Sequence, residues 1–269
     1  MDIDPWAFLR DHTAARIAQG RAGHSIPTRA LLDFQLDHAR ARDAVYSQLN
    51  TAELCAQLSR IQVGVQLLHS QATDRPTYLQ RPDLGRKLDE ASRTALQVFC
   101  QSDQGDVNRF TLSIVVVDGL SATAINQHAV AVVNNLTAQC KPLGWTLAPI
   151  CLVQQGRVAI GDEIAHCLGA EMVIVLIGER PGLSSPDSLG AYMTYQPRPG
   201  LTDESRNCVS NIRPEGLPYD FAVQKLLYLL TEMKSRRLSG VDLKDEMPTH
   251  TLPNTSSPVA IGQSPETPD

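Results

Sequence analysis

The side chains best placed to do chemistry follow three apolar runs between residues 113 and 178. Runs such as "SIVVV" and "MVIVLI" are typical of strands buried on both faces of a parallel sheet. Open α/β sheets bind ligands beyond the carboxyl ends of their strands, so we predict that the turns after these runs share one edge and form the candidate site. The turns are Asp118-Gly119-Leu120-Ser121, Gln155-Gly156-Arg157-Val158 and Gly178-Glu179-Arg180.

The first of these turns lacks the residues of the common phosphate and nucleophile motifs. It has one glycine and places Asp118 where a phosphate would be repelled, and the chain has neither GxGxxG nor a GKS or GKT loop. Ser121 is central in "GLSAT", but Thr123 replaces the final glycine of a nucleophile elbow, which disfavours a serine hydrolase. A structural alternative, in which Asp118 and Ser121 bind turn amides and cap the next helix, stays open.

The histidines and cysteines predict no metal site and no catalytic residue. The six cysteines lie far apart, without a CxxC pair or a histidine at zinc-ligand spacing, and we expect reduced thiols. His128 falls inside a predicted helix and is interpreted as structural. "DEIAHCLG" has the H-x-x-G spacing of domains whose histidine binds the cobalt of a corrinoid, but Ile164 stands where that motif has an acid. We therefore expect Asp162 and His166 on a solvated helix face rather than at a cobalt ion.

The N-terminal part, residues 1–105, is predicted to be mainly helical. Thr28 can cap a helix whose apolar residues recur near the helical period, while most charged residues fall off that stripe. "NTAELCAQLSRI" and the segment after Pro82 also read as helix, and "VGVQLLH" alternates like a short strand. The first helix must pack against something, either within this chain or on a partner. Its apolar stripe contains Leu31, Phe34, Ala41, Val45 and Leu49.

The second part, residues 106–244, alternates strands with helices. This order predicts βαβ units and an α/β fold: a Rossmann-like parallel sheet flanked by helices, preceded by the helical N-terminal region. A helix is expected to end at Gly169, and the last helix to begin near Phe221. Between Arg180 and Tyr219 we expect one long loop, and loops of that length are usually functional. Residues 245–269 are proline-rich and predicted to be a disordered tail.

The composition excludes several classes of partner. The 269 residues carry a net charge of -5, from 29 acidic and 24 basic residues, and no basic stripe that could follow a nucleic-acid backbone. No apolar run is long enough to cross a membrane, and the N-terminus lacks the features of a secretion signal. We therefore expect no nucleic acid, no membrane and a cytoplasmic location.

Five long blocks of the sequence carry a resemblance to a known family. The blocks are "ARIAQGRAGHSIPTRALLDFQLDHARARDAV", "YLQRPDLGRKLDEAS", "VVVDGLSATAI", "IGDEIAHCLGAEMVIVLIGERPGLSSPDSLGAYMTY" and "RNCVSNIRPEGLPYD". Together, and in this order, they resemble the small subunit, or light chain, of ethanolamine ammonia-lyase. The resemblance runs from about Asp4 to Leu238.

The resemblance implies an adenosylcobalamin-dependent elimination that converts ethanolamine to acetaldehyde and ammonia. In the family, a large subunit holds the substrate, and the small subunit closes over cobalamin that keeps its own benzimidazole as lower ligand. The family's cobalamin-contacting positions match Val158, Glu179 and Cys208, and we expect the Asp118 turn to frame the same pocket. Some members carry an N-terminal extension linked to bacterial microcompartments. Because this chain begins close to the shared segment, we expect the cytoplasm, and a bacterial microcompartment stays open as the alternative.

Two other functions stay open on the residues alone. One is a freestanding α/β enzyme that uses a nucleotide or nicotinamide cofactor, although the missing GxGxxG counts against it. The other is a non-catalytic interaction or scaffold protein. The chain by itself is not expected to be a complete enzyme.

Overall fold

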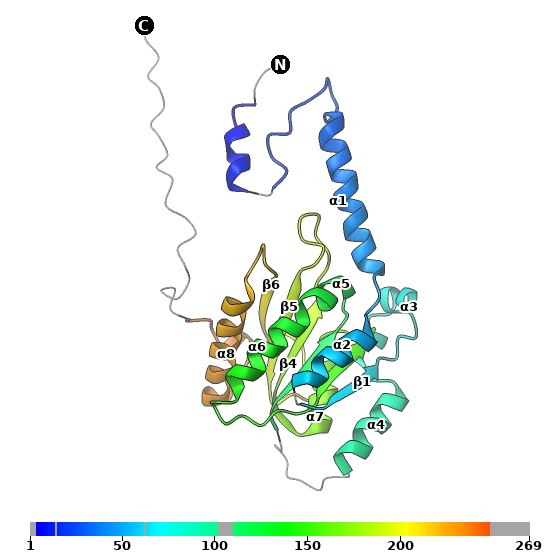
Figure 1. Cartoon of the computed structure of the whole chain (residues 1–269), viewed down its shortest axis with the longest axis vertical. Helices are drawn as coiled ribbons and strands as arrows, with labels where there is room; N and C mark the ends of the chain where they lie inside the picture. The colour runs from blue at the N-terminus through cyan, green and yellow to red at the C-terminus, as the bar shows by residue number, and fades with distance from the viewer. Residues whose placement is uncertain (1–3, 14, 62, 102–109, 248–269) are drawn as a thin grey trace.

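A six-stranded mixed sheet forms the centre of the protein (Figure 1). The computed structural model describes residues 4–13, 15–61, 63–101 and 110–247. Across the sheet the strands run in the order β1-β3-β2-β4-β5-β6. Their bounds are β1 (Val65–His69), β2 (Phe110–Val117), β3 (Ile150–Gln154), β4 (Ala170–Gly178), β5 (Leu189–Tyr195) and β6 (Asn207–Ile212).

The four strands from β1 to β4 are parallel, as the alternation of strands and helices predicted. Val117, the last residue of β2, pairs with Val153 of β3 on one side and with Ile177 of β4 on the other. The carboxyl ends of the three strands are therefore level. This register brings the turns that follow them to one edge of the sheet.

The predicted long loop between Arg180 and Tyr219 was wrong. This segment contributes β5 and β6, which continue the sheet in antiparallel order from β4, so the sheet is mixed rather than all parallel. Neither strand is a continuous apolar run, and Gly190 and Ser210 interrupt them. Their extended conformation is supported by hydrogen-bond ladders, of β5 to β4 and of β6 to β5, which a sequence pattern does not reveal.

Helices cover both faces of the sheet (Figure 1). One apolar core lies between the sheet and α2, α6 and α8, and a second between the sheet and α4 and α7. The α-helices are α1 (Thr28–Tyr46), α2 (Thr51–Leu58), α3 (Arg75–Gln80), α4 (Glu90–Gln101), α5 (Ala122–Ala124), α6 (Val130–Cys140), α7 (Ile160–Leu168) and α8 (Tyr219–Arg236). Short helical turns are η1 (Ala7–His12), η2 (Ser59–Ile61), η3 (Leu84–Arg86), the π-helical η4 (Ile125–Ala129), η5 (Asp203–Ser205) and η6 (Gly240–Asp242).

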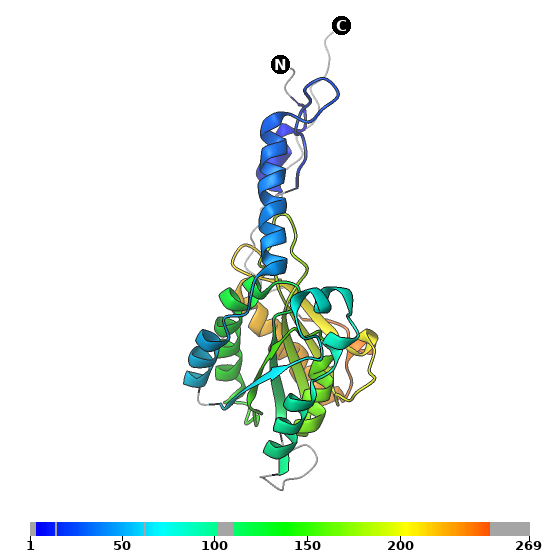
Figure 2. The ribbon, with the colours of Figure 1, turned by 90° about the vertical axis from the view of Figure 1, so that its right-hand side faces the viewer.

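Helix α1 projects from the sheet domain (Figure 2), and Arg16, in the segment before it, donates a hydrogen bond to Asp37 of the helix at 2.6 Å. We call residues 4–13 and 15–46 the N-terminal arm. The helix begins at Thr28 as predicted, although Thr28 is its first residue and not its cap. Ala44 is the one residue of α1 that is buried. The apolar side chains of the helix therefore do not pack into the core of this chain.

Several other predictions concern the ends of elements. Helix α7 ends at Gly169, which adopts the left-handed conformation (φ 65°), as predicted. The predicted boundary between residues 105 and 106, and all but the first three residues of the predicted tail, lie outside the described residues. None of the helices in the described ranges is both long enough and apolar enough to cross a membrane.

Candidate functional site

The three turns predicted from the sequence line one surface pocket of about 480 Å³. Leu120 comes from the first turn, Arg157 and Val158 from the second, and Glu179 and Arg180 from the third. The level ends of β2, β3 and β4 place them there, which confirms the prediction of a shared edge. The other lining residues are Gly178, also of the third turn, and Tyr78, Ile177 and Tyr192.

Asp118 follows β2 and is buried, and its carboxylate accepts three backbone hydrogen bonds. The N–H groups of Gly119, Gln155 and Gly156 donate to it at 2.9, 2.8 and 3.1 Å. Burial raises the pKa of Asp118 to about 6, because loss of hydration outweighs these hydrogen bonds and the charge of Arg75. The carboxylate thus ties the first turn to the second. The structural alternative for Asp118 is confirmed.

Gly119 and Ser121 bring the first turn against the third. Gly119 has a left-handed φ of 58°, and a Cβ there would lie 2.3 Å from the carbonyl oxygen of Gly178, so only glycine fits. The hydroxyl of Ser121 accepts a hydrogen bond from the Ala124 N–H at 3.3 Å and donates one to the Pro186 carbonyl at 2.8 Å. Ser121 therefore caps α5, as the structural alternative proposed, and also binds the β4–β5 connection.

Glu179 follows β4 and presents a fixed carboxylate to the pocket. Its Oε2 accepts hydrogen bonds from the Ser188 hydroxyl and from the Asn211 N–H, the latter at 3.2 Å. The side chain packs on Gly190, where a Cβ would lie 2.8 Å from Oε1. No residue in the described ranges donates a hydrogen bond to Oε1. The carboxylate is thus oriented by protein groups and keeps an acceptor for a ligand.

Val158 lines this pocket, whereas Cys208 is not among its lining residues. Val158 precedes α7, is half-buried and lines the pocket. Cys208 is exposed and lies on β6 rather than in the predicted loop; it pairs with Tyr192 of β5, and Tyr192 lines the pocket. Its Sγ is 3.3 Å from the Ser210 hydroxyl, and desolvation raises the pKa of the thiol. This environment disfavours a thiolate nucleophile.

Asp162 does not lie on a solvated face of α7, and that expectation was wrong. Its side chain is 2% exposed and forms an ion pair with Arg206, which is 1% exposed. Two guanidinium nitrogens donate to the two carboxylate oxygens at 2.7 Å each. The apolar neighbours of Asp162 in α7 pack into the second core, so the helix turns the acid inward. His166 is exposed, as predicted.

Nearly the whole chain is similar to proteins of one known family. A family described as "Ethanolamine ammonia-lyase light chain (EutC)" matches residues 3–244. The chain belongs to this light chain family. A protein of Pseudomonas fluorescens (strain Pf0-1), named ethanolamine ammonia-lyase small subunit, is 56% identical over 249 residues, which cover 93% of this chain and 90% of the relative.

Other relatives with the same name are similarly close. The protein of Pseudomonas putida (strain F1) is 55% identical over 254 residues, covering 94% of this chain and 92% of the relative. The protein of Pseudomonas syringae pv. tomato (strain DC3000) is 52% identical over 254 residues, covering 94% of this chain and 88% of the relative. The similarity therefore extends through the sheet domain and the N-terminal arm.

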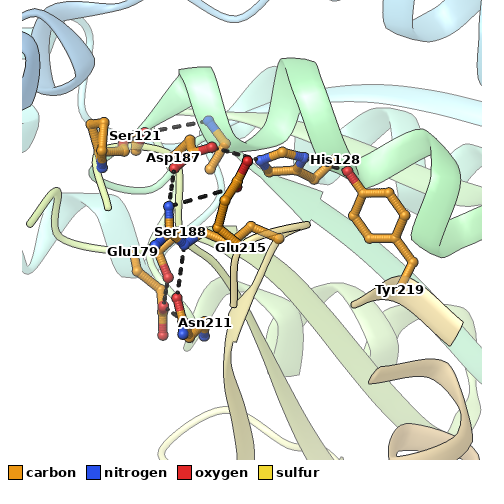
Figure 3. A network of polar contacts seen from close by, with 11 residues as sticks. Ser121, His128, Glu179, Asp187, Ser188, Asn211, Glu215 and Tyr219 are labelled. Carbon is orange, nitrogen blue, oxygen red and sulfur yellow. Dashed lines mark hydrogen bonds and ion pairs between the residues drawn. The ribbon is translucent and has the colours of Figure 1, made fainter. Parts of the chain in front are cut away.

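A buried histidine of this family member begins a polar network that reaches Glu179 (Figure 3). His128 lies in the π-helical turn η4, a geometry often found at functional sites. Its Nδ1 is 2.7 Å from the Tyr219 hydroxyl and its Nε2 is 3.2 Å from Oδ2 of Asp187. Both ring nitrogens therefore have protein partners, which confirms His128 as a structural histidine.

Arg213 connects Asp187, the partner of the histidine, to Asn211, the partner of Glu179. It donates to Oδ1 of Asp187 at 3.2 Å and to the side-chain oxygen of Asn211 at 3.0 Å. Asn211, in the left-handed conformation with a φ of 59°, in turn donates its N–H to Glu179. The network thus joins η4, the β4–β5 connection and the end of β6. Its partners lie far apart in the sequence, so sequence reasoning missed it.

The thiols and acids of the described residues form no metal site. Each of the six cysteines is a free thiol, and Sγ of Cys100 lies 4.0 Å from Sγ of Cys167. Within the described residues no three His, Cys, Asp or Glu side chains are grouped so as to hold a metal ion.

Proposed function

We propose that the chain is the small subunit of an adenosylcobalamin-dependent ethanolamine ammonia-lyase, and that its pocket contacts the coenzyme where it meets the large subunit. The observation that carries this proposal is the position of the three expected contact residues. Val158 and Glu179 line one pocket, and Cys208 lies beside Tyr192 of that pocket. Family membership and the names of the relatives support the proposal independently.

The residues of the pocket fit a corrinoid, whose rim carries many amide side chains. Glu179 can accept a hydrogen bond from an amide N–H2 at Oε1, because Ser188 and Asn211 fix the carboxylate through Oε2. Val158 offers an apolar surface next to the first backbone N–H groups of α7. The side chains of Tyr78 and Arg157, which also line the pocket, keep buried polar atoms without protein partners.

The coenzyme, when bound, supplies the radical chemistry of the elimination. The residues of this chain bind and orient it and help to exclude water from the interface. Cys208 acts through packing, since desolvation of its sulfur raises the pKa of the thiol. No residue of the pocket is assigned a proton-transfer step, and the reacting substrate is assigned to the large subunit.

The N-terminal arm is proposed to form a second contact with the large subunit. Leu32 and Leu36 of α1 are 58% and 52% exposed, and Trp6 and Phe8 are exposed as well. A monomer rarely presents so many large apolar side chains in one region unless they meet a partner. The alternative, that the stripe of α1 is buried within this chain, finds no support in the burial of the helix.

The test is reconstitution with the large subunit of a Pseudomonas ethanolamine ammonia-lyase. Ammonia release from ethanolamine is expected only when both chains and adenosylcobalamin are present. Full activity of the large subunit alone would contradict the proposal. Turnover of a nucleotide cofactor by the isolated chain would favour a freestanding enzyme, and cobalamin affinity unaffected by this chain would favour a scaffold.

A further inference from the structure

Tyr78 brings two arginine side chains to the edge of the pocket. The Cζ atom of Arg157 is 4.2 Å from the centroid of the Tyr78 ring, and that of Arg75 is 4.7 Å away. Helix α3, which carries Tyr78, is fixed at its start because Asp74 accepts a hydrogen bond from the Thr77 N–H at 2.8 Å. Tyr78 is fully buried. The ring therefore offers a rigid surface on which guanidinium groups stack.

Arg157 is held in one place before any ligand arrives. Its Nη2 donates to the carbonyl of Tyr78 at 3.1 Å, and its backbone N–H donates to the carbonyl of Gly85 at 2.7 Å. A Cβ on Gly85 would lie 2.9 Å from Cγ of Arg157, so the absence of a side chain at Gly85 makes room for the arginine stem. A guanidinium oriented in this way loses little entropy when it binds an anion.

The pocket holds hydrogen-bond donors and positive charge that this chain does not satisfy. Nε of Arg157 and the hydroxyl of Tyr78 are buried without a hydrogen-bond partner. Within the described residues neither Arg157 nor Arg180 forms an ion pair, although both line the pocket. The carboxylate among the lining residues, Glu179, is bonded to Ser188 and Asn211. Unpaired buried donors beside an arginine fit an anion with several acceptor oxygens.

We propose that Arg157 and the Tyr78 hydroxyl bind the phosphodiester of the nucleotide tail of cobalamin. This inference rests on the proposed function. The ring substituents of cobalamin are neutral amides, so the phosphodiester is the anionic group that an unpaired arginine can recognise. Val158 follows Arg157 directly, which puts a contact to the ring and a contact to the tail on neighbouring residues. Arg180, at the end of the third turn, adds positive charge to the same pocket.

The test compares two corrinoids on the reconstituted complex. Cyanocobalamin carries the phosphodiester, whereas cobinamide keeps the ring and its amides but ends before it. Dissociation constants are measured by equilibrium dialysis for wild type and for Arg157→Gln. Loss of a charged hydrogen bond should weaken cyanocobalamin binding about tenfold or more and leave cobinamide binding within about twofold. Inorganic phosphate should compete with cyanocobalamin more strongly than chloride at equal ionic strength.

Two further variants keep the test decisive. Tyr78→Phe removes only the hydroxyl and should weaken cyanocobalamin selectively even if Arg157→Gln does not fold. Arg60→Gln, an exposed arginine before β1, should change neither affinity. If Arg157→Gln and Tyr78→Phe weakened the binding of both corrinoids equally, or of neither, the proposed phosphate contact would be wrong. The proposal that this chain contacts cobalamin would still stand. If phosphate bound to the complex without displacing cyanocobalamin, the arginine site would belong to a separate anion, and the phosphodiester contact would be wrong. If the wild-type complex bound neither corrinoid, the proposed function would be wrong as well.

Discussion

Arg206 and Asp162 form an ion pair inside the protein, with two N–H···O hydrogen bonds of 2.7 Å and almost no solvent exposure. The pair joins the first turn of α7 to the residue before β6. Asp162 lies four residues after Val158, and Arg206 lies two residues before Cys208. Two of the proposed cobalamin contacts are therefore held in register by one buried pair.

Breaking this pair should be costly, because it leaves a buried charge without a partner. We expect Arg206→Met to lower the free energy of unfolding by about 3 to 5 kcal/mol. The double variant Arg206→Met with Asp162→Leu should recover part of the loss, since no buried charge is left. Urea unfolding of the free subunit measures both.

The matched control for this prediction is an exposed ion pair. Arg236 and Glu232 of α8 lie 2.7 Å apart but are 44% and 28% exposed. Arg236→Met should leave the unfolding midpoint unchanged, because water and salt screen such pairs. Equal effects of Arg206→Met and Arg236→Met would show that burial of the pair does not matter.

Asp118 should make stability depend on pH in a defined direction. Its pKa in the folded protein is raised to about 6, above its ordinary value of 3.8, so the folded state binds a proton more tightly than the unfolded state. The stability that this proton contributes is fully present below the ordinary pKa and is lost as pH rises through about 6. Relative to Asp118→Asn, which does not titrate, the wild type should lose roughly 2 kcal/mol between pH 4 and pH 7. A constant difference in urea unfolding across this range would contradict the shift.

The parallel half of the fold follows directly from the sequence, and the antiparallel half does not. Strands β2 and β4 are continuous apolar runs that require burial on both faces, so their type and direction could be predicted. Strands β5 and β6 contain polar and glycine residues, and their extended form is supported by pairs such as Leu176 with Ala191. Such pairing is a property of the folded chain and leaves little local signal.

The candidate site was predictable to a similar extent. The shared edge of the three turns follows from strand direction alone. The contacts of Asp162 and Tyr78 cross long sequence separations, so a single sequence does not show them. A weak signal existed for Asp162, because it stands between the buried residues Gly161 and Ile164 of α7. A carboxylate on the buried face of a helix is costly unless a cation pairs with it, and Arg206 is that cation.

Glu179 gives a direct test of the pocket. We expect Glu179→Ala to weaken cobalamin binding to the reconstituted complex about tenfold, because a charged acceptor at the rim is lost. The free subunit should still fold, since Glu179 is only half-buried and its partner Asn211 is exposed, so that the Asn211 N–H can bind water instead. Equilibrium dialysis measures the affinity, and circular dichroism checks the fold. The control Glu215→Ala removes an exposed acid at 3.9 Å from Arg213 and should leave affinity unchanged.

The N-terminal arm should be needed for assembly and dispensable for the fold of the sheet domain. Helix α1 contributes one buried residue, so the paired change Leu32→Asp and Leu36→Asp should leave the thermal midpoint of the free subunit unchanged. The same change should abolish co-purification with the large subunit, because two charges would enter an apolar interface. Val98→Asp on α4 is the matched control, since Val98 is 60% exposed but lies outside the arm. If both substitutions left the complex intact, the exposed apolar side chains of α1 would have to meet something other than the large subunit.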